Sequence, residues 1–143
     1  MEQQQRYTLG KNDKLKSTKA IEQLFKEGRT FSAFPFRVLY LEAPASGTEN
    51  EALKPALQTA FSVSKKYFKK AVDRNRIKRL MREAWRLQKN VLATKINANN
   101  KNLKVFIIYT GNELPAYELV FEKTATVIRR LIKSSNETTI TNP

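Results

Sequence analysis

The sequence of 143 residues contains no cysteine and no histidine. Without cysteine the chain has no disulfide bond and no thiol nucleophile. Without histidine it lacks the usual general base at neutral pH and the commonest metal ligand. Acidic residues are also scarce, with 13 Asp and Glu against 27 Lys and Arg. These absences argue against a self-contained hydrolase and indicate a protein that works by binding.

Long apolar runs are missing as well. No stretch approaches the length of about 18 apolar residues that crosses a bilayer, so we expect no membrane association. The N-terminus lacks the apolar core of a signal peptide, and the cytoplasm is the expected location. A hydrophobic content of 41% is normal for a globular domain. We expect flexible tails at 1–14 and 135–143, and a single folded domain at 15–134.

Hydrophobic periodicity divides this domain into helices and strands. The pattern predicts helices at 17–28, at 75–91 and from 115 onward, and strands at 36–41, 57–63 and 104–109. We expect the first two strands to pair antiparallel through a loop at 43–55, and residues 93–103 to form an Asn-rich loop. This order predicts the α+β class, as a two-layer α–β sandwich in which helices pack on a small, mostly antiparallel sheet.

Positive charge is concentrated between residues 65 and 89. This window holds eleven Lys and Arg against two acidic residues, so it carries +9 of the net charge of +14. Charge at this density repels itself unless it meets a polyanion, which makes nucleic acid the expected partner. On a helix the window separates into two faces. The apolar face comprises Ile77, Leu80, Met81, Ala84, Trp85, Leu87 and Val91, and the polar face Asn75, Lys78, Arg79, Arg82, Arg86 and Lys89.

The residue types on the polar face suit phosphate binding. Arginine can grip a phosphate with two hydrogen bonds, and lysine supplies a point charge. Arg74 and Arg76 flank Asn75, whose amide could orient an arginine or contact a ribose or base edge. RNA is favoured over DNA because aromatic residues near the charge, Tyr40 and Tyr67 with Phe68, could stack on unpaired bases. The alternatives are a solvated helix face, a loop that lysines keep soluble, and ordinary strand or core roles for Tyr40 and Phe25.

Two adjoining motifs carry a family resemblance. FSVSKK at 61–66, followed by AVDRNRIKRLMREA at 71–84, resembles the signature of the bacterial ribonuclease P protein component. A weaker resemblance covers residues 15–134, including LFKEG, FRVLYL and KVFIIY. It implies a sandwich with a left-handed βαβ crossover.

The resemblance also implies a function. The protein would be the accessory subunit of a ribonucleoprotein endonuclease, a monomer in a 1:1 complex with ribonuclease P RNA. It would bind that RNA and the 5′ leader of precursor tRNA, and promote Mg²⁺-dependent removal of the leader. Catalysis and most of the Mg²⁺ would belong to the RNA, with no catalytic or metal-binding residue in the protein. The alternatives are a structural or ribosomal RNA-binding protein with no processing role, and a protein-only nuclease.

Site residues follow from the resemblance and from the charged stripe. The RNA-binding set is Ser62, Lys65, Lys66, Arg74, Asn75, Arg76, Lys78, Arg79 and Arg82, to which the stripe adds Arg86. Phe25 and Tyr40 match positions that line the leader-binding cleft, and Tyr67 is added as a neighbouring aromatic. The assignment requires that the arginines point in one direction and are not paired with the protein's own carboxylates.

Overall fold

The computed structural model describes residues 15, 18–44 and 56–141, with side chains up to Ser135. The elements are α1 (Thr18–Glu27), β1 (Arg29–Ala33), β2 (Phe36–Pro44), β3 (Leu57–Val63), α3 (Ala71–Ala98), β4 (Lys101–Tyr109) and α4 (Tyr117–Thr141). The expected α+β class is confirmed, with one strand, β1, that the sequence analysis did not predict. The tail expected at 1–14 and the loop residues 45–55 lie outside the described residues.

The four strands form one mixed sheet in the order β1-β2-β4-β3. The β1–β2 and β2–β4 pairs are antiparallel, and β3 pairs with β4 in parallel. The expectation that β2 and β3 pair with each other is wrong, because β4 lies between them. A parallel pair needs a crossover connection, and α3 provides it.

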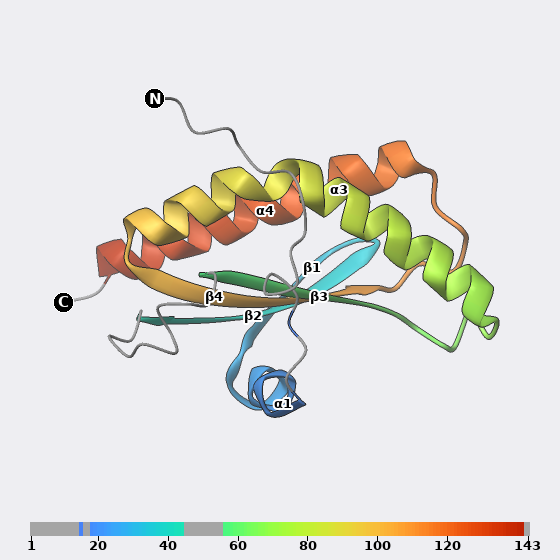
Figure 1. The fold of residues 1–143 in the computed structure, drawn as a ribbon, viewed down its shortest axis with the longest axis horizontal. Helices are drawn as coiled ribbons and strands as arrows, with labels where there is room; N and C mark the ends of the chain where they lie inside the picture. The colour runs from blue at the N-terminus through green and yellow to red at the C-terminus, as the bar shows by residue number, and fades with distance from the viewer. Residues whose placement is uncertain (1–14, 16–17, 45–55, 142–143) are drawn as a thin grey trace, which may run out of the picture.

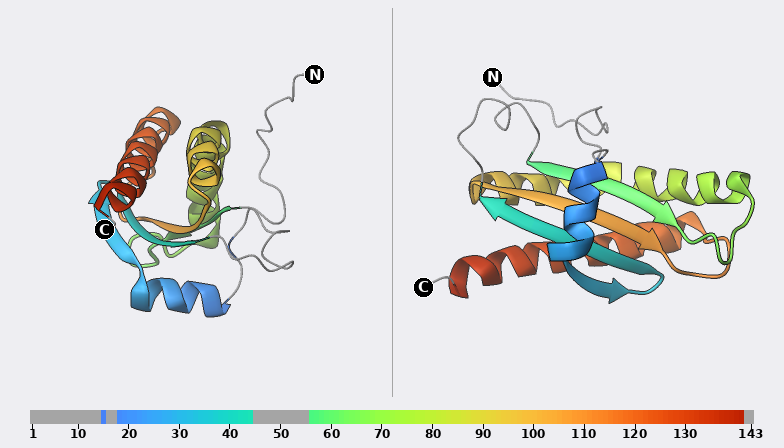
Figure 2. Two further views of the ribbon diagram at one scale, coloured as in Figure 1. Left: turned by 90° about the vertical axis from the view of Figure 1, so that its left-hand side faces the viewer. Right: turned by 90° about the horizontal axis from the view of Figure 1, so that it is seen from below.

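The crossover has the handedness that the family resemblance implies. Seen from the side of α1, β3 and β4 run from left to right, the chain steps down from β3 to β4, and α3 lies behind the sheet (Figure 2). This arrangement is left-handed, whereas nearly all such connections are right-handed.

Helices cover the two faces of the sheet unequally. α3 and α4 lie side by side over one face, and the short α1 crosses the other (Figure 1). The main core, which includes Val105 and Ile107 of β4 and the fully buried Trp85 of α3, lies beneath the helix pair. A second, smaller cluster of Leu15, Leu24 and Leu39 lies beneath α1. Since α1 is short, it leaves part of the sheet face on which it packs exposed to solvent.

Two helix ends differ from expectation. α3 continues through Ala98, so most of the loop expected at 93–103 is helical. Asparagine has a weak helix propensity, but burial of Leu92 and Ile96 against the core outweighs it. The chain then reverses at Asn100, whose φ of 57° is a left-handed value that asparagine tolerates. At the C-terminus α4 extends to Thr141, into the segment expected to be a tail.

The buried face of α3 is rotated relative to the predicted one. Ile77, Met81, Ala84 and Trp85 are buried as expected, together with Leu92, Ile96 and Lys89. Leu87 and Val91, predicted as core, are 39% and 63% exposed. The helix packs against both the sheet and α4, so two neighbours set the centre of its buried face. The aliphatic stem of Lys89 fits into this face because lysine can bury its methylene groups while its charge stays near water.

Candidate nucleic-acid interface

The exposed side of α3 carries a row of arginines. Arg76, Arg79 and Arg82 are all exposed, as is Asn75, while Lys78 is half-buried. Within 18–44 and 56–135, no carboxylate forms an ion pair with these three arginines. Their spacing of three residues places them along one stripe of the helix. We call Arg76, Arg79 and Arg82 the arginine stripe; its guanidinium groups are available to phosphate oxygens.

Arg86 extends this row but is engaged by a neighbour. Its Nη2 lies 2.5 Å from Oε1 of Glu83, and its Nε donates to Oε2 at 3.1 Å. Hydrogen bonding from Arg86 holds the pKa of the Glu83 carboxyl below its usual value. The Arg86 guanidinium is therefore paired within the protein, and its contact with RNA stays a prediction. Because this ion pair is exposed to solvent, an RNA phosphate can compete with Glu83 for the Arg86 guanidinium.

Arg74 makes contacts within the protein that the sequence analysis did not predict, and its contact with RNA stays a prediction. Its Nη1 donates to the carbonyl oxygens of Phe68 and Lys69, both at 2.8 Å. These contacts tie the first turn of α3 to the loop that precedes it. Arg74 therefore positions the loop.

The loop at 64–70, which joins β3 to α3, presents basic and aromatic side chains outward. Lys65, Lys66 and Tyr67 are exposed, and the ammonium of Lys66 lies 5.4 Å from the centroid of the Tyr67 ring. Phe68, considered as a possible RNA contact, is instead buried against Tyr109 with ring centroids 6.0 Å apart. Phe68 thus anchors the loop, and Tyr67 is its accessible aromatic residue.

The sheet face beside α1 holds a second group of candidate residues. Phe25 of α1 is 55% exposed, and its ring meets that of Phe106 edge-on at 5.4 Å. Across the sheet, the register aligns Arg37, Ile108 and Ser62, and strand alternation puts all three on the same face as Phe106. This row leads from the exposed aromatic rings toward the basic loop.

Sequence reasoning missed Arg37, Phe106 and Ile108. The run KVFIIY suggested a strand buried on both faces, but Phe106 and Ile108 are only partly buried because α1 covers little of the sheet. The alternation of β2 was a usable signal, since it puts Arg37 on the same face as Leu39.

Tyr40 does not join this group. Its side chain points toward α3 and α4, is 9% exposed, and donates from its hydroxyl to Oγ of Ser134 at 3.2 Å. Its ring also packs edge-on against Phe31 at 5.8 Å. Phe25 and Tyr40 therefore do not line one cleft as the family resemblance implied, because β2 directs Tyr40 to the opposite face of the sheet.

Neither a metal centre nor a membrane span is found in the part of the chain that the structure describes. No three acidic side chains there gather closely enough to hold a metal ion. None of its helices has the length and apolar character that crossing a membrane requires.

Comparison with known proteins agrees with this geometry. The family model described as Ribonuclease P matches residues 9–133. The chain is 34% identical over 114 residues to the ribonuclease P protein component of Porphyromonas gingivalis strain ATCC 33277, covering 80% of this chain and 79% of that protein. It is 29% identical over 131 residues to the protein of the same name from Chlorobium phaeobacteroides, covering 87% and 88%.

Solved structures share the fold. The ribonuclease P protein from Thermotoga maritima superposes with a TM-score of 0.60 at 24% identity, covering 82% of this chain and 96% of that one. The Staphylococcus aureus protein gives 0.60 at 18% identity, covering 82% and 94%. The sequence matches, the shared fold and the exposed arginine stripe agree, and the chain belongs to the ribonuclease P protein family.

Proposed function

We propose that this protein works as the protein subunit of ribonuclease P and binds the RNA subunit through the arginine stripe and the 64–70 loop. The observation that carries the proposal is the direction of Arg76, Arg79 and Arg82. All three face solvent along one side of α3, and no carboxylate in the described residues pairs with them. A stripe of unpaired guanidinium groups favours a phosphate backbone, which offers acceptors at regular intervals.

The exposed sheet face is the proposed site for the 5′ leader of precursor tRNA. A leader is single-stranded, and unpaired bases stack on accessible aromatic rings. Phe25 and Phe106 supply such rings, and Arg37 lies on the same face for the backbone. This surface replaces the leader site predicted from Phe25, Tyr40 and Tyr67. Tyr67 stays a candidate contact at the loop end of the row.

The chemistry of cleavage is assigned to the RNA subunit. The proposal places most of the Mg²⁺ with the RNA, where phosphate oxygens are the ligands that this ion prefers. The protein's part is to bind, orient and neutralise phosphates as a monomer in a 1:1 complex. The cytoplasmic location stays a prediction.

Reconstitution tests the proposal. Adding the full-length protein to ribonuclease P RNA at low Mg²⁺ is expected to increase the rate of leader removal from precursor tRNA. A matched reaction contains protein, precursor tRNA and Mg²⁺ without the RNA subunit, and its substrate is expected to stay intact. No gain in the first reaction would favour a structural RNA-binding protein. Accurate 5′ processing in the second would show a protein-only nuclease.

A further inference from the structure

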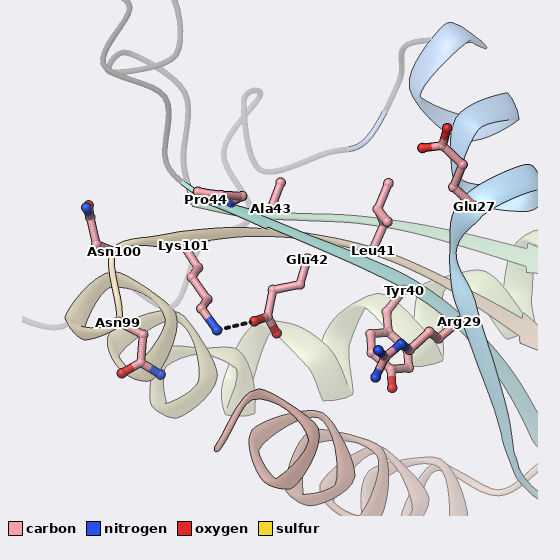
Figure 3. Close-up of a pocket in the computed structure, with 10 residues that line it drawn as sticks. All are labelled: Glu27, Arg29, Tyr40, Leu41, Glu42, Ala43, Pro44, Asn99, Asn100 and Lys101. Atoms are coloured by element: carbon pink, nitrogen blue, oxygen red, sulfur yellow. Dashed lines mark ion pairs between the residues drawn. The ribbon is translucent and has the colours of Figure 1, made fainter. Parts of the chain in front are cut away.

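A pocket beside the end of β2 has an ion pair of the protein's own at its centre. Lys101 and Glu42 converge from β4 and β2 (Figure 3), with Nζ of the lysine 2.7 Å from Oε1 of the glutamate. Both side chains are largely buried and engage each other, so they are not free to bind a ligand. The surface between α3 and α4 differs from this pocket, because its apolar and charged groups are accessible.

The two helices that cover the main core leave a groove between them. α3 and α4 run side by side in the same direction (Figure 1), and Gln88 on α3 donates to the carbonyl oxygen of Phe121 on α4 at 3.0 Å. A groove of about 400 Å³ follows this contact and is lined entirely by residues of the two helices. No strand residue lines the groove, so it opens on the side of the helix pair that faces away from the sheet.

Apolar side chains form both walls of the groove. On α3, Leu87 and Val91 are one turn apart, and both are exposed. On α4, Ala125, Ile128 and Ile132 follow one another at intervals of three and four residues. Hydrophobic periodicity assigned the two α3 residues to the core. The apolar side of α3 is therefore wider than the core that covers it, and the excess lines the groove.

The groove favours a partner that satisfies its own backbone. Residues inside a helix use their N–H and C=O groups within that helix, so α3 and α4 offer no row of main-chain donors and acceptors to a strand. A third helix brings a backbone that is already hydrogen-bonded. Its side chains at positions i, i+3, i+4 and i+7 can pack between two neighbouring helices. This surface therefore suits an amphipathic helix.

The charge near the groove sets the charge of that helix. Residues 84–98 of α3 and 123–135 of α4 contain three and four Lys and Arg, and neither stretch contains Asp or Glu. The nearest acids in the sequence, Glu83 and Glu122, precede these stretches, and Glu83 is paired with Arg86. Acidic side chains on the partner would complement this excess of positive charge.

Arg129 is the charged residue of the groove itself. Its guanidinium is exposed and donates to Oγ1 of Thr126 at 3.2 Å, and it forms no ion pair with a carboxylate of residues 18–44 and 56–135. Lys133 is exposed one turn further along α4. Asp or Glu beside the apolar stripe of a docked helix could pair with both cations, which would guide its association and fix its register.

Two other occupants fit the groove less well. A second copy would set one groove against another and bring together two chains that each carry a net charge of +14. RNA is attracted by the cations, but the apolar walls offer no hydrogen bond to its phosphates. An acidic amphipathic helix matches both the apolar walls and the cations.

We propose that the groove between α3 and α4 is a docking site for an amphipathic α-helix of a partner protein, with Asp or Glu beside its apolar stripe. The inference does not rest on the proposed ribonuclease P function, because it uses no residue of the arginine stripe, the 64–70 loop or the sheet face beside α1. Arg82 lies on the opposite side of α3 from Val91, since nine residues make about two and a half turns. The RNA subunit and the partner helix are therefore expected to bind at the same time.

Fluorescence anisotropy with synthetic peptides tests the proposal. The probe is a labelled helical peptide with leucine at positions i, i+3, i+4 and i+7 and glutamate beside them. One control peptide has the same residues in an order that scatters the leucines around the helix, and another has lysine in place of glutamate. We expect the probe to bind about tenfold or more tightly than the rearranged peptide, and the lysine peptide not to bind. No binding of the probe, or equal binding of the probe and the rearranged peptide, would overturn the proposal.

Two pairs of variants locate the site. Val91→Asn removes an apolar contact from the groove and is expected to weaken binding of the probe about fivefold. Val72→Asn, at an exposed valine in the first turn of α3, is the matched control and is expected to leave the affinity unchanged. Arg129→Gln is expected to weaken binding about threefold, and Arg29→Gln, at an exposed arginine of β1, is its control. Equal effects within either pair would place the peptide elsewhere and overturn the proposal.

Two measurements test the other occupants. Adding the RNA subunit to the complex of protein and probe is expected to leave the probe bound, and its displacement would assign the groove to RNA. Sedimentation of the protein alone is expected to show a monomer. A dimer that Val91→Asn dissociates would assign the groove to a second copy. Either of these contrary results would overturn the proposal.

Discussion

The guanidinium of Arg74 reaches back from α3 to the carbonyl oxygen of Phe68, with Nη1 at 2.8 Å. Phe68 in turn is buried against Tyr109 at the end of β4. The basic loop is therefore fixed at both sides, by a buried ring and by a charged hydrogen bond. This arrangement separates two arginines that the motif treats as equivalent, since Arg76 has no such contact within the described residues.

The first prediction separates these two arginines. Arg76→Ala is expected to weaken binding of ribonuclease P RNA without changing stability, because Arg76 is exposed and contacts no protein carboxylate. Arg74→Ala is expected to weaken RNA binding and also to lower the free energy of unfolding. The loss of stability is about 1 kcal/mol, because the hydrogen-bonded group that is removed is partly exposed. Urea denaturation and RNA titration measure the two effects. Arg129→Ala on α4 is the matched control for the loss of one positive charge. Equal stability of Arg74→Ala and Arg76→Ala would show that the hydrogen bonds from Arg74 to the loop do not stabilise the fold.

The second prediction concerns salt. Each phosphate neutralised contributes a slope of about −0.7 to −0.9 to the plot of log affinity against log salt. Replacing Arg76, Arg79 and Arg82 together by Ala is therefore expected to make the slope for binding of the RNA subunit less negative by about 2 to 3. Affinity measured over a series of KCl concentrations gives the slope. An unchanged slope would show that the arginine stripe does not contact the RNA backbone.

A third prediction tests which face of α3 is buried. Met81 is 1% exposed, so Met81→Asp places an unpaired charge in the core and is expected to abolish cooperative unfolding. Val91 is 63% exposed, and Val91→Asp is expected to change stability by less than about 0.5 kcal/mol. Circular dichroism and thermal melting compare the two. If Val91→Asp unfolded the domain, the face predicted from hydrophobic periodicity would be the correct one.

The leader site gives a fourth prediction. Phe25→Ala is expected to reduce the preference for precursor tRNA over mature tRNA by about tenfold, the effect of one lost stacking contact. Phe34→Ala removes a ring that is 72% exposed at the tip of the β1–β2 hairpin and is the control. Tyr40→Phe, which changes a side chain on the opposite face, is also expected to keep the preference. Competition binding with both tRNAs measures it, and equal losses from Phe25→Ala and Phe34→Ala would rule out a specific site.

A fifth prediction follows from Tyr109. Burial, with a smaller contribution from Glu113, raises the pKa of its hydroxyl, which donates to the Glu113 carbonyl at 2.6 Å. A raised pKa in the folded state means that the folded protein keeps its proton where the unfolded chain has lost it. The resulting stabilisation is complete below the unfolded pKa of about 10 and is lost as pH rises toward the folded value.

In Tyr109→Phe, the free energy of unfolding is therefore expected to fall less steeply between about pH 9 and about pH 11 than in the unmodified protein. The free energy of unfolding, measured in urea at several pH values, gives the slope. Tyr67→Phe removes a hydroxyl from an exposed ring and is the control. A slope in Tyr109→Phe that matches the unmodified protein would assign the alkaline loss to other groups.

The parts of this protein that depend on neighbours in sequence were predictable. The stripe of Arg76, Arg79 and Arg82 follows from helical spacing alone, and the end of α1 follows from Gly28, whose N–H bonds to Leu24. The sheet order was not predictable, because the last strand in the sequence, β4, lies between the two earlier strands β2 and β3. The alternation of residues gives the two faces of β2, but it does not show which face packs against α3 and α4. Tyr40 was therefore predicted at the leader site although it lies on the face that these helices cover.

Contacts to backbone atoms were also beyond the sequence. The carbonyls that hold Arg74 belong to a loop whose path depends on the packing of Phe68. The pairing of Arg86 with Glu83 was predictable from their spacing of three residues, because side chains at that spacing lie close together on one side of a helix.

The position of β4 also sets an order of assembly. During synthesis β2 and β3 emerge first, yet they have no strand to join them until Tyr109 has left the ribosome. Until then the apolar side of α3 has no complete sheet to pack against. The pairing of β4 with β2 and β3 joins residues far apart in the sequence, and such pairing slows folding. The nascent chain therefore completes the support for its cationic helix only after β4 has been made.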